Sequence, residues 1–410
     1  MNRFLWTERR ILERVRLWSL VIGIVCMAAC VIGAFFDPQQ FFRAYLAPYL
    51  FYQGIGLGCF VLLMIFHVTG GAWGFLIRRF LEAGTRTLPL LALLLIPVGC
   101  GLHYTFLWAR PEVVAADPNL QGKHLYLNVP FWWARAVLFF VIWLIFAYFL
   151  NLWSRREDET GDPRYARRLE ILSGPGLVAY GICMHFAAID WIMSLQPDYK
   201  SSIFGPLVAS GQVLSGLTWA LIVFAIFAVR PPLSEAVSDK TLCDLGNLFL
   251  SFIVVWAYMV FFEFMLVWIA NLRPEVGWYL DRSRGGWWWV NWLLVLFHFA
   301  VPFLLLLHRA VKQNLAWLAV LAGSVLGTHL MFLYWQVLPA FPTASLAHHW
   351  MDFLMPVALG GIWFAWFLWQ LVQRPILPLH DKNAAHAMLL RHEDLEQAER
   401  EAVMSHGGRI

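Results

Sequence analysis

The sequence predicts an all-α integral membrane protein with ten transmembrane helices. Of its 410 residues, 60% are hydrophobic and only 14% are charged, too few charges to cover a soluble domain of this length. Ten apolar runs are long enough to cross a hydrocarbon core of about 30 Å, which takes about 20 helical residues. The basic residues between those runs are divided unevenly between the two sides.

The expected spanning runs, in chain order, are 17–36, 47–69, 87–107, 131–153, 171–194, 206–230, 246–271, 287–309, 314–338 and 348–372. The first follows five arginines, as in a signal peptide, but its apolar part is too long for one and no A-x-A cleavage site follows. The chain therefore divides into a basic N-terminus (1–16), a membrane domain (17–372) and a polar tail (373–410).

The positive-inside rule orients these helices. With the N-terminus in the cytoplasm, 22 Lys and Arg residues lie on the inner side and seven on the outer side. Both termini are therefore expected to be cytoplasmic. The charged segment 154–170 is expected to be a solvated inner loop, and 70–86 an inner connection. The outer connections 108–130 and 272–286 are rich in aromatic residues and resemble a docking surface.

The cysteine pattern limits the redox chemistry that the chain itself can carry. Six cysteines occur, without C-x-x-C, C-x-x-C-H or any spacing that fits an iron–sulfur cluster. The sequence also lacks a P-loop and a nucleophile elbow. We expect no covalent or thiolate-ligated redox centre in this chain.

Polar residues inside the apolar runs are the candidate functional groups, because titratable side chains are costly in hydrocarbon. By residue count, His103, Arg135 and Asp190 lie in the outer quarter, His185 and Glu263 about a turn deeper, and His298 and His329 near the midplane. His185 and Asp190 are separated by about 140° around their helix and do not share a face. Arg135 is the expected charge partner of a carboxylate, by depth.

These residue types suit quinol oxidation, which needs acceptors for two protons beside an apolar slot. We assign His185 and Asp190 as proton acceptors. Glu263, His298 and His329 form a candidate inward proton line, with Arg135 and His103 at its outer end. In the plainer interpretation Asp190 reaches interfacial water, Glu263 is a protonated packing residue, and the histidines only pack.

Two other functions stay open at this point. In a secondary transporter the same polar groups would bind a substrate or coupling ion, but no matched pair of Gly/Pro breaks occurs in the two halves of the sequence. In a cytochrome b-like protein, His298 and His329 would ligate haem b from similar depths.

Several motifs resemble one family closely. They are Asp190-Trp-Ile-Met-Ser-Leu-Gln-Pro197 with Ser201-Ser-Ile-Phe-Gly205, Trp256-Ala-Tyr-Met-Val-Phe-Phe-Glu-Phe-Met-Leu-Val-Trp-Ile-Ala-Asn271 with Pro274-Glu275 and Trp278-Tyr279, Pro302-Phe-Leu-Leu-Leu-Leu307 with Lys312, and Pro375-Ile-Leu-Pro-Leu-His-Asp381. This set resembles the second quinone-type membrane subunit of alternative complex III, a bacterial quinol:electron-acceptor oxidoreductase. The chain departs from the family at Asp198, where members often carry His, and some members carry Gln in place of Glu263.

The resemblance implies an NrfD/PsrC-like fold, with four-helix bundles from helices 2–5 (about 47–194) and 6–9 (about 206–338). It implies a multi-pass protein of the bacterial cytoplasmic membrane, with menaquinol or ubiquinol as ligand. The implied partners are multihaem cytochrome c and iron–sulfur subunits on the outer face, which carry the haem c and clusters, a paralogous NrfD-like membrane subunit, and lipid. The resemblance also implies that this chain itself carries no metal. No nucleic acid is expected.

Overall fold

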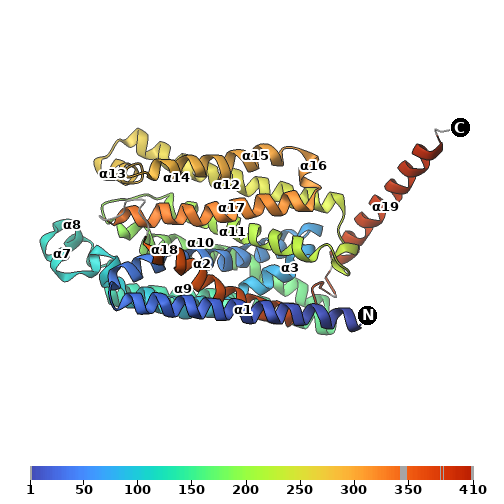
Figure 1. Cartoon of the computed structure of the whole chain (residues 1–410), viewed down its shortest axis with the longest axis horizontal. Helices are drawn as coiled ribbons and strands as arrows, with labels where there is room; N and C mark the ends of the chain where they lie inside the picture. The colour runs from blue at the N-terminus through green and yellow to red at the C-terminus, as the bar shows by residue number, and fades with distance from the viewer. Residues whose placement is uncertain (1, 342–348, 379, 382, 408–410) are drawn as a thin grey trace.

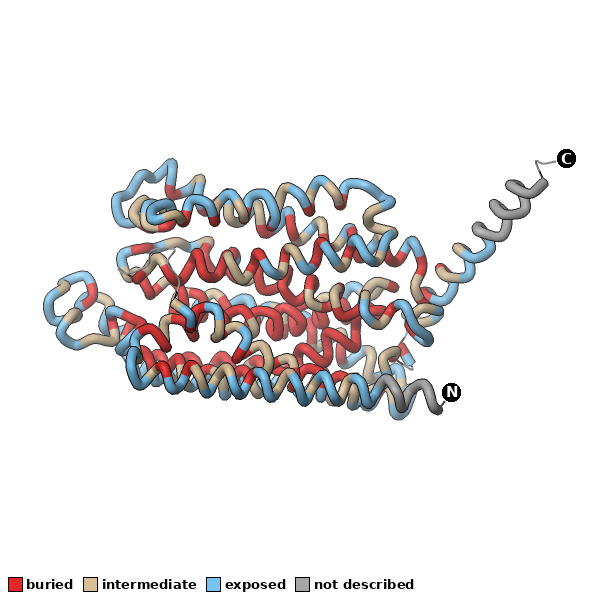
Figure 2. The backbone as a smooth tube through the Cα atoms, in the orientation of Figure 1, coloured by how far each residue is buried: buried red, intermediate tan, exposed pale blue. Residues whose placement is uncertain are grey.

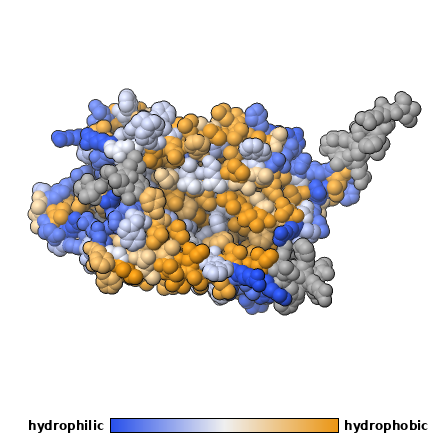
Figure 3. Space-filling model, in the orientation of Figure 1, coloured by the Kyte–Doolittle hydropathy of each residue, from blue (hydrophilic) through white to orange (hydrophobic). Residues whose placement is uncertain are grey.

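The computed structural model describes residues 2–341, 349–378, 380–381 and 383–407, with side chains between 9 and 396. All regular structure in these residues is helical, and ten helices are long and apolar enough to cross a membrane, as predicted. The helices run alongside one another in an elongated bundle (Figure 1). On the face that Figure 3 shows, apolar surface covers the middle of the bundle and hydrophilic surface gathers at both ends.

The spans follow the predicted order. They are α1 (Asn2–Ala34), α2 (Pro38–Thr69), α3 (Ala72–Thr85) with α4 (Leu88–Leu94) and α5 (Ile96–Cys100), α9 (Val129–Thr160), α10 (Pro163–Trp191), α11 (Phe204–Phe227), α12 (Asp239–Ala270), α14 (Trp287–Leu293) with a π-helical turn (Leu294–Ala300) and α15 (Val301–Leu306), α17 (Leu315–Val337), and α18 (Trp350–Val372).

Shorter helices connect the spans. They are α6 (Leu102–Thr105), α7 (Pro111–Ala116), α8 (Pro118–Gly122), α13 (Arg273–Asp281) and α16 (Arg309–Lys312). Helix α19 (Ala384–Gly407) projects away from the bundle, at the same end as the start of α1 (Figure 1). Helices α7 and α8 project at the opposite end.

Capping residues explain why several helices begin before their apolar run does. Asp37, Asn128, Asp162, Ser238 and Asn314 each accept a backbone N–H from the first turn of the next helix. Proline lies in the first turn after three of these caps, where its missing N–H costs nothing. These helices therefore begin at polar capping residues, and their apolar, membrane-crossing part begins several residues later.

Two expected connections are wrong. The third span starts at Ala72, because the predicted inner connection 70–86 is largely α3, which is almost entirely buried. The predicted solvated loop 154–170 is helix except at Gly161 and Asp162, with Gly161 in a left-handed conformation that ends α9. Hydropathy missed α3 because its charged side chains find partners inside the fold. In 154–170 most charged side chains are exposed, as predicted, but they lie on helix and not on a loop.

Helices α2 and α11 form the centre of the molecule (Figure 2). They contact each other at Gly58 and Gly216, and α2 also contacts α3, α10, α17 and α18. A Cβ atom on Gly58 would lie 1.9 Å from the backbone oxygen of Gln212. The close crossing therefore requires glycine, as in other membrane helix pairs where small residues let backbones approach.

We expect Gly58→Ala to lower the thermal unfolding midpoint of the detergent-purified protein. The added methyl group meets backbone, which cannot move aside alone, and overpacking of this kind costs about 1–3 kcal/mol. Gly181→Ala is the matched control, because a Cβ on this exposed α10 glycine meets nothing within 4 Å. Equal unfolding midpoints for the two variants would contradict the close contact between α2 and α11 at Gly58.

Candidate functional site

A buried ion pair joins the start of α9 to the end of α10. Arg135 donates from Nε to Asp190 Oδ2 at 2.7 Å and from its second guanidinium nitrogen to Oδ1 at 2.8 Å. Both side chains are buried, Asp190 to 1% exposure. The guanidinium also donates to the carbonyl of Tyr126 and lies 3.9 Å from the centre of that ring. Arg135 is thus the charge partner of a carboxylate, as its depth indicated.

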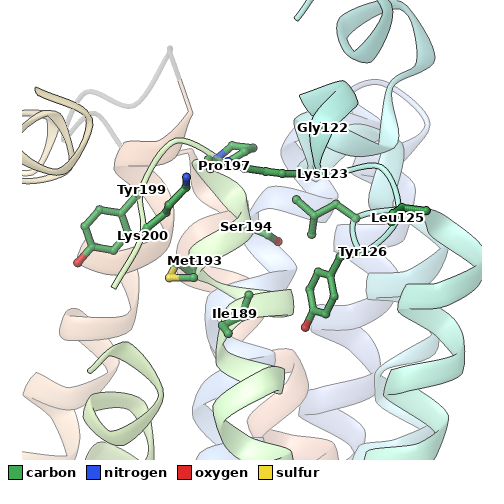
Figure 4. Close-up of a pocket in the computed structure, with 11 residues that line it drawn as sticks. Gly122, Lys123, Leu125, Tyr126, Ile189, Met193, Ser194, Pro197, Tyr199 and Lys200 are labelled. Carbon is green, nitrogen blue, oxygen red and sulfur yellow. Dashed lines mark hydrogen bonds between the residues drawn. The ribbon is translucent and has the colours of Figure 1, made fainter. Parts of the chain in front are cut away.

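A cavity of about 320 Å³ lies beside Tyr126, the residue that contacts Arg135 (Figure 4). Tyr126 and Leu125 lie on one side of it, Tyr199 and Lys200 on the other, and Ile189 and Met193 below. The Lys123 ammonium donates to the Pro197 carbonyl. Burial and the neighbouring Lys200 charge lower the pKa of Lys123. The lining is mostly apolar, with a few polar groups at its edge.

Two tyrosines connect this cavity to buried carboxylates. Tyr126 covers the arginine that holds Asp190, and burial together with the Asp190 charge raises the pKa of Tyr126. Tyr199 donates its hydroxyl to Glu263 Oε1 at 2.5 Å, and burial together with the Glu263 charge raises the pKa of Tyr199. Each carboxylate therefore lies directly behind the lining of the cavity.

Arg282 supports the second carboxylate from the loop after α13. Its guanidinium carbon lies 3.1 Å from the centre of the Trp278 ring, and Trp278 stacks on Tyr199 at 4.3 Å. Arg282 is fully buried and donates to Gln196 Oε1 at 2.8 Å and to the Gln336 carbonyl at 2.5 Å. Burial lowers the pKa of Arg282 to about 9, so the side chain stays cationic at neutral pH.

The two histidines that were expected near the midplane, His298 and His329, meet deeper in the bundle. The rings of His298, on the π-helical turn, and His329, on α17, lie 5.6 Å apart. His298 Nδ1 lies 2.9 Å from the Thr328 hydroxyl. A cavity of about 10 Å³ touches His329 and Gln336. The His298 ring also lies 3.9 Å from the Trp256 ring and the His329 ring 5.9 Å from the Phe332 ring, so each histidine packs against a neighbouring aromatic ring.

Glutamines surround the histidines, although none was among the predicted site residues. Tyr180 donates to Gln212 Oε1 at 2.8 Å, and Gln212 donates to Gln53 Oε1 at 3.2 Å. Among the described side chains, His298 Nε2, His329 Nδ1, Gln53 Nε2 and Gln336 Oε1 are buried polar atoms without a hydrogen-bond partner. Glutamine within an apolar run was the available signal, but it does not titrate and so carried less weight than His, Asp or Glu.

His185 and His103 lie apart from these groups. His185 is half-buried between α10 and α11, where a Cβ on Gly205 would come within 2.4 Å of its Nδ1. It is not among the residues that line the cavity of about 320 Å³, and neither is Asp190. His103 is exposed at the end of α6, with its ring against Tyr104. The structure therefore does not bring His185 and Asp190 to one site.

A second buried ionic cluster lies toward the opposite end of the bundle. Arg78 contacts Glu82 at 3.0 Å and both Glu157 and Asp381 at 2.6 Å. Glu82, which is fully buried, also contacts Arg79 at 2.7 Å and Arg374 at 3.0 Å. The cluster ties α3 to α9 and to the segment after α18, so charges expected in solvated connections stabilise the interior.

Ten apolar spans around buried ionic and polar groups define a multi-pass, all-helical membrane protein. No protein-family model matches the chain, and no curated protein matches its sequence. Within the described residues, no three His, Cys, Asp or Glu side chains are placed to hold a metal ion.

Proposed function

We propose that the chain is a membrane subunit of a quinol:electron-acceptor oxidoreductase of the alternative complex III type. The cavity lined by Tyr126 and Tyr199 carries this proposal. Its volume is about 320 Å³, its lining is mostly apolar, and a buried carboxylate lies behind each of these two tyrosines. Pockets for small ligands have this mostly apolar character with a few placed polar groups. The quinol ring fills the cavity and its isoprenoid tail extends into lipid.

Oxidation of one quinol releases two protons and two electrons. The protons pass through Tyr199 to Glu263 and past Tyr126 to the Arg135–Asp190 pair. The electrons pass to haem c and iron–sulfur clusters in partner subunits, which dock on the outer loops. His185 lies outside the lining, and we assign it no proton.

The inward proton line runs from Glu263 and Arg282 through Gln336 to His298 and His329. Arg282 contacts the backbone of Gln336, whose side chain lines the small cavity beside His329. That cavity is close to the volume one water molecule needs, and several polar atoms around it have a free hydrogen-bonding position. A water molecule there would connect Gln336 to His329.

The proposed orientation places both termini in the cytoplasm. Arg78 and Arg79 lie on α3 and so no longer count as charges of an inner loop. Without them, Lys and Arg residues on the inner side still outnumber those on the outer side. The contacts between helices support two four-helix bundles: α2, α3–α4, α9 and α10 contact one another in a ring, as do α11, α12, α14–α15 and α17. The membrane is then the bacterial cytoplasmic membrane, and a paralogous NrfD-like subunit lies beside the chain.

Secondary transport is the second candidate function. The third span is interrupted between α3 and α4, and the eighth contains the π-helical turn. Transporters place their broken helices at corresponding positions of two repeats. The interrupted third span is the second helix of the first four-helix ring. The eighth span, with the π-helical turn, is the third helix of the second ring. The two irregularities therefore do not lie at corresponding positions.

The test is purification of the tagged chain in mild detergent, with mass spectrometry of co-purifying subunits and a quinol oxidation assay. We expect haem and iron–sulfur subunits to accompany it. Glu263→Gln keeps the hydrogen bond to Tyr199 but removes the proton acceptor, so activity should fall about 100-fold. The control is Glu112→Gln, on the exposed α7.

Three results would contradict the proposal. One is purification of the chain as a lone, colourless protein. A second is full quinol oxidation by the Glu263→Gln complex, and a third is an equal loss of activity in Glu112→Gln.

A further inference from the structure

Another large cavity lies near the end of the bundle where α1 begins. It measures about 450 Å³ and lies between the α3–α4 junction, α9 and the end of α18. Three arginines line it: Arg86, Arg155 and Arg374. No acidic side chain is among the described residues in its wall. None of the proposed quinol or proton groups belongs to it.

The α9 wall of this cavity changes from apolar to basic along its length. It runs from Leu144 through Ala147, Tyr148 and Leu152 to Arg155, eleven residues or about 16 Å. The lipid-exposed side chains of α9 end near Tyr148 and Phe149, and charged residues start at Arg155. The cavity therefore crosses the boundary between hydrocarbon and headgroups, with its cationic part at the headgroup level.

The three guanidinium groups keep donors available. Within the described chain, Arg86 makes no ion pair with a carboxylate, and its Nε donates to the Glu82 carbonyl at 3.2 Å. Arg155 has a 3.3 Å contact with Glu159 in which both side chains are at least half-exposed, and exposed pairs of this kind contribute little.

Arg374 is held more firmly. It donates to Glu82 Oε2 at 3.0 Å and to the Asn151 carbonyl at 2.8 Å. Glu82 is the carboxylate behind this wall, and it is shared among Arg374, Arg78 and Arg79. The ionic cluster therefore holds Arg374 in place, while Arg86 and Arg155 remain to contact a ligand.

We propose that this cavity is a binding site for an anionic phospholipid, with the phosphodiester at Arg86 and Arg155 and an acyl chain along the Leu144–Tyr148 wall. Guanidinium groups bind phosphate oxygens through two parallel hydrogen bonds, and basic pockets between membrane helices bind acidic headgroups. The apolar wall requires an acyl chain, so free phosphate would use only half of the site. In the proposed orientation the lipid belongs to the cytoplasmic leaflet.

The test uses the full-length chain, with any co-purifying subunits, delipidated in a zwitterionic detergent. Phosphatidylglycerol or phosphatidylcholine is titrated in, and binding is measured by native mass spectrometry and by the shift in unfolding temperature. We expect phosphatidylglycerol to bind and phosphatidylcholine not to bind. Each of Arg86→Gln and Arg155→Gln should weaken that binding about fivefold, and the double variant more.

Arg156→Gln is the matched control, because Arg156 is the next residue of α9 and lies outside the cavity wall. Arg155→Lys keeps the charge but loses the two parallel hydrogen bonds, so its binding should fall between that of the unchanged protein and that of Arg155→Gln. The lipid-free unfolding temperature of every variant reports folding separately. Equal binding of phosphatidylcholine, saturation by inorganic phosphate alone, or an equal loss in Arg156→Gln would each overturn the site. None of these outcomes bears on quinol oxidation.

Discussion

Replacing Arg135 with methionine should destabilise the protein by about 3–5 kcal/mol, because it leaves the Asp190 carboxylate buried without its counter-charge. Methionine keeps part of the packing against Tyr126 and Phe131, so most of the loss is electrostatic. We expect poor accumulation in membranes and a large fall in the unfolding midpoint. Thermal unfolding followed by light scattering or intrinsic tryptophan fluorescence measures it.

Removing both charges should restore much of that stability. In Arg135→Met combined with Asp190→Leu, no buried charge remains, and replacement of a buried pair by apolar side chains is often neutral. The double-mutant cycle isolates the pair from other effects of either change. Additive losses would show that the two residues do not interact as the 2.7 Å contact indicates.

The same variant separates structure from catalysis at Asp190. A stable double variant that still oxidises quinol would mean that Asp190 accepts no proton during turnover. A stable but inactive one, with Glu263 untouched, would support its role as an acceptor. The stability measurement and the activity measurement therefore answer different questions about one residue.

Glu82→Gln should have the second large effect, again a loss of about 3–5 kcal/mol. This carboxylate is fully buried and contacts Arg78, Arg79 and Arg374, and Ser154 donates a hydrogen bond to it at 2.5 Å. Glutamine preserves the shape but removes the one negative charge that, among the described side chains, all three arginines share. The unfolding midpoint and the amount of folded protein in detergent measure the loss.

The ionic cluster also predicts where such a variant should loosen. Arg78 holds Asp381 at 2.6 Å, so weakening the cluster should expose the segment after α18 to limited proteolysis before the helices unfold. Glu159→Gln is the matched control on α9, because its pair with Arg155 is half-exposed and should contribute at most about 1 kcal/mol. Similar losses in both variants would contradict the burial of this cluster.

The predictable parts of the fold are the features that depend on the sequence of a single helix, such as its length, its apolar character and its place in the chain. Ten apolar runs correspond to ten spans in the right order, because a membrane-crossing helix must satisfy its own backbone and present apolar side chains along its length. Depth along the helix also predicted a carboxylate partner for Arg135 and a common level for His298 and His329, since rise per residue is constant. The structure pairs Arg135 with Asp190 and places the two histidine rings 5.6 Å apart.

The starts of helices were missed where polar signals outweighed hydropathy. Gly161, Asp162 and Pro163 end one helix and begin the next in the pattern expected of a left-handed C-cap, an N-cap and a first-turn proline. The surrounding charges nevertheless favoured a solvated loop. Arg78 and Arg79 were likewise assigned to a connection, because nothing near them in sequence supplies all of their buried partners.

Composition and hydropathy were enough to predict that the chain is helical, is apolar enough to cross a membrane ten times, and carries titratable groups inside its spans. Which of those groups share a site became clear only from how the helices pack. The packing separates His185 from Asp190, brings Tyr199 and Arg282 to Glu263, and gathers three arginines into one cavity wall. Pairing of buried charges depends on how helices rotate and pack, and side-chain spacing along one helix cannot encode that.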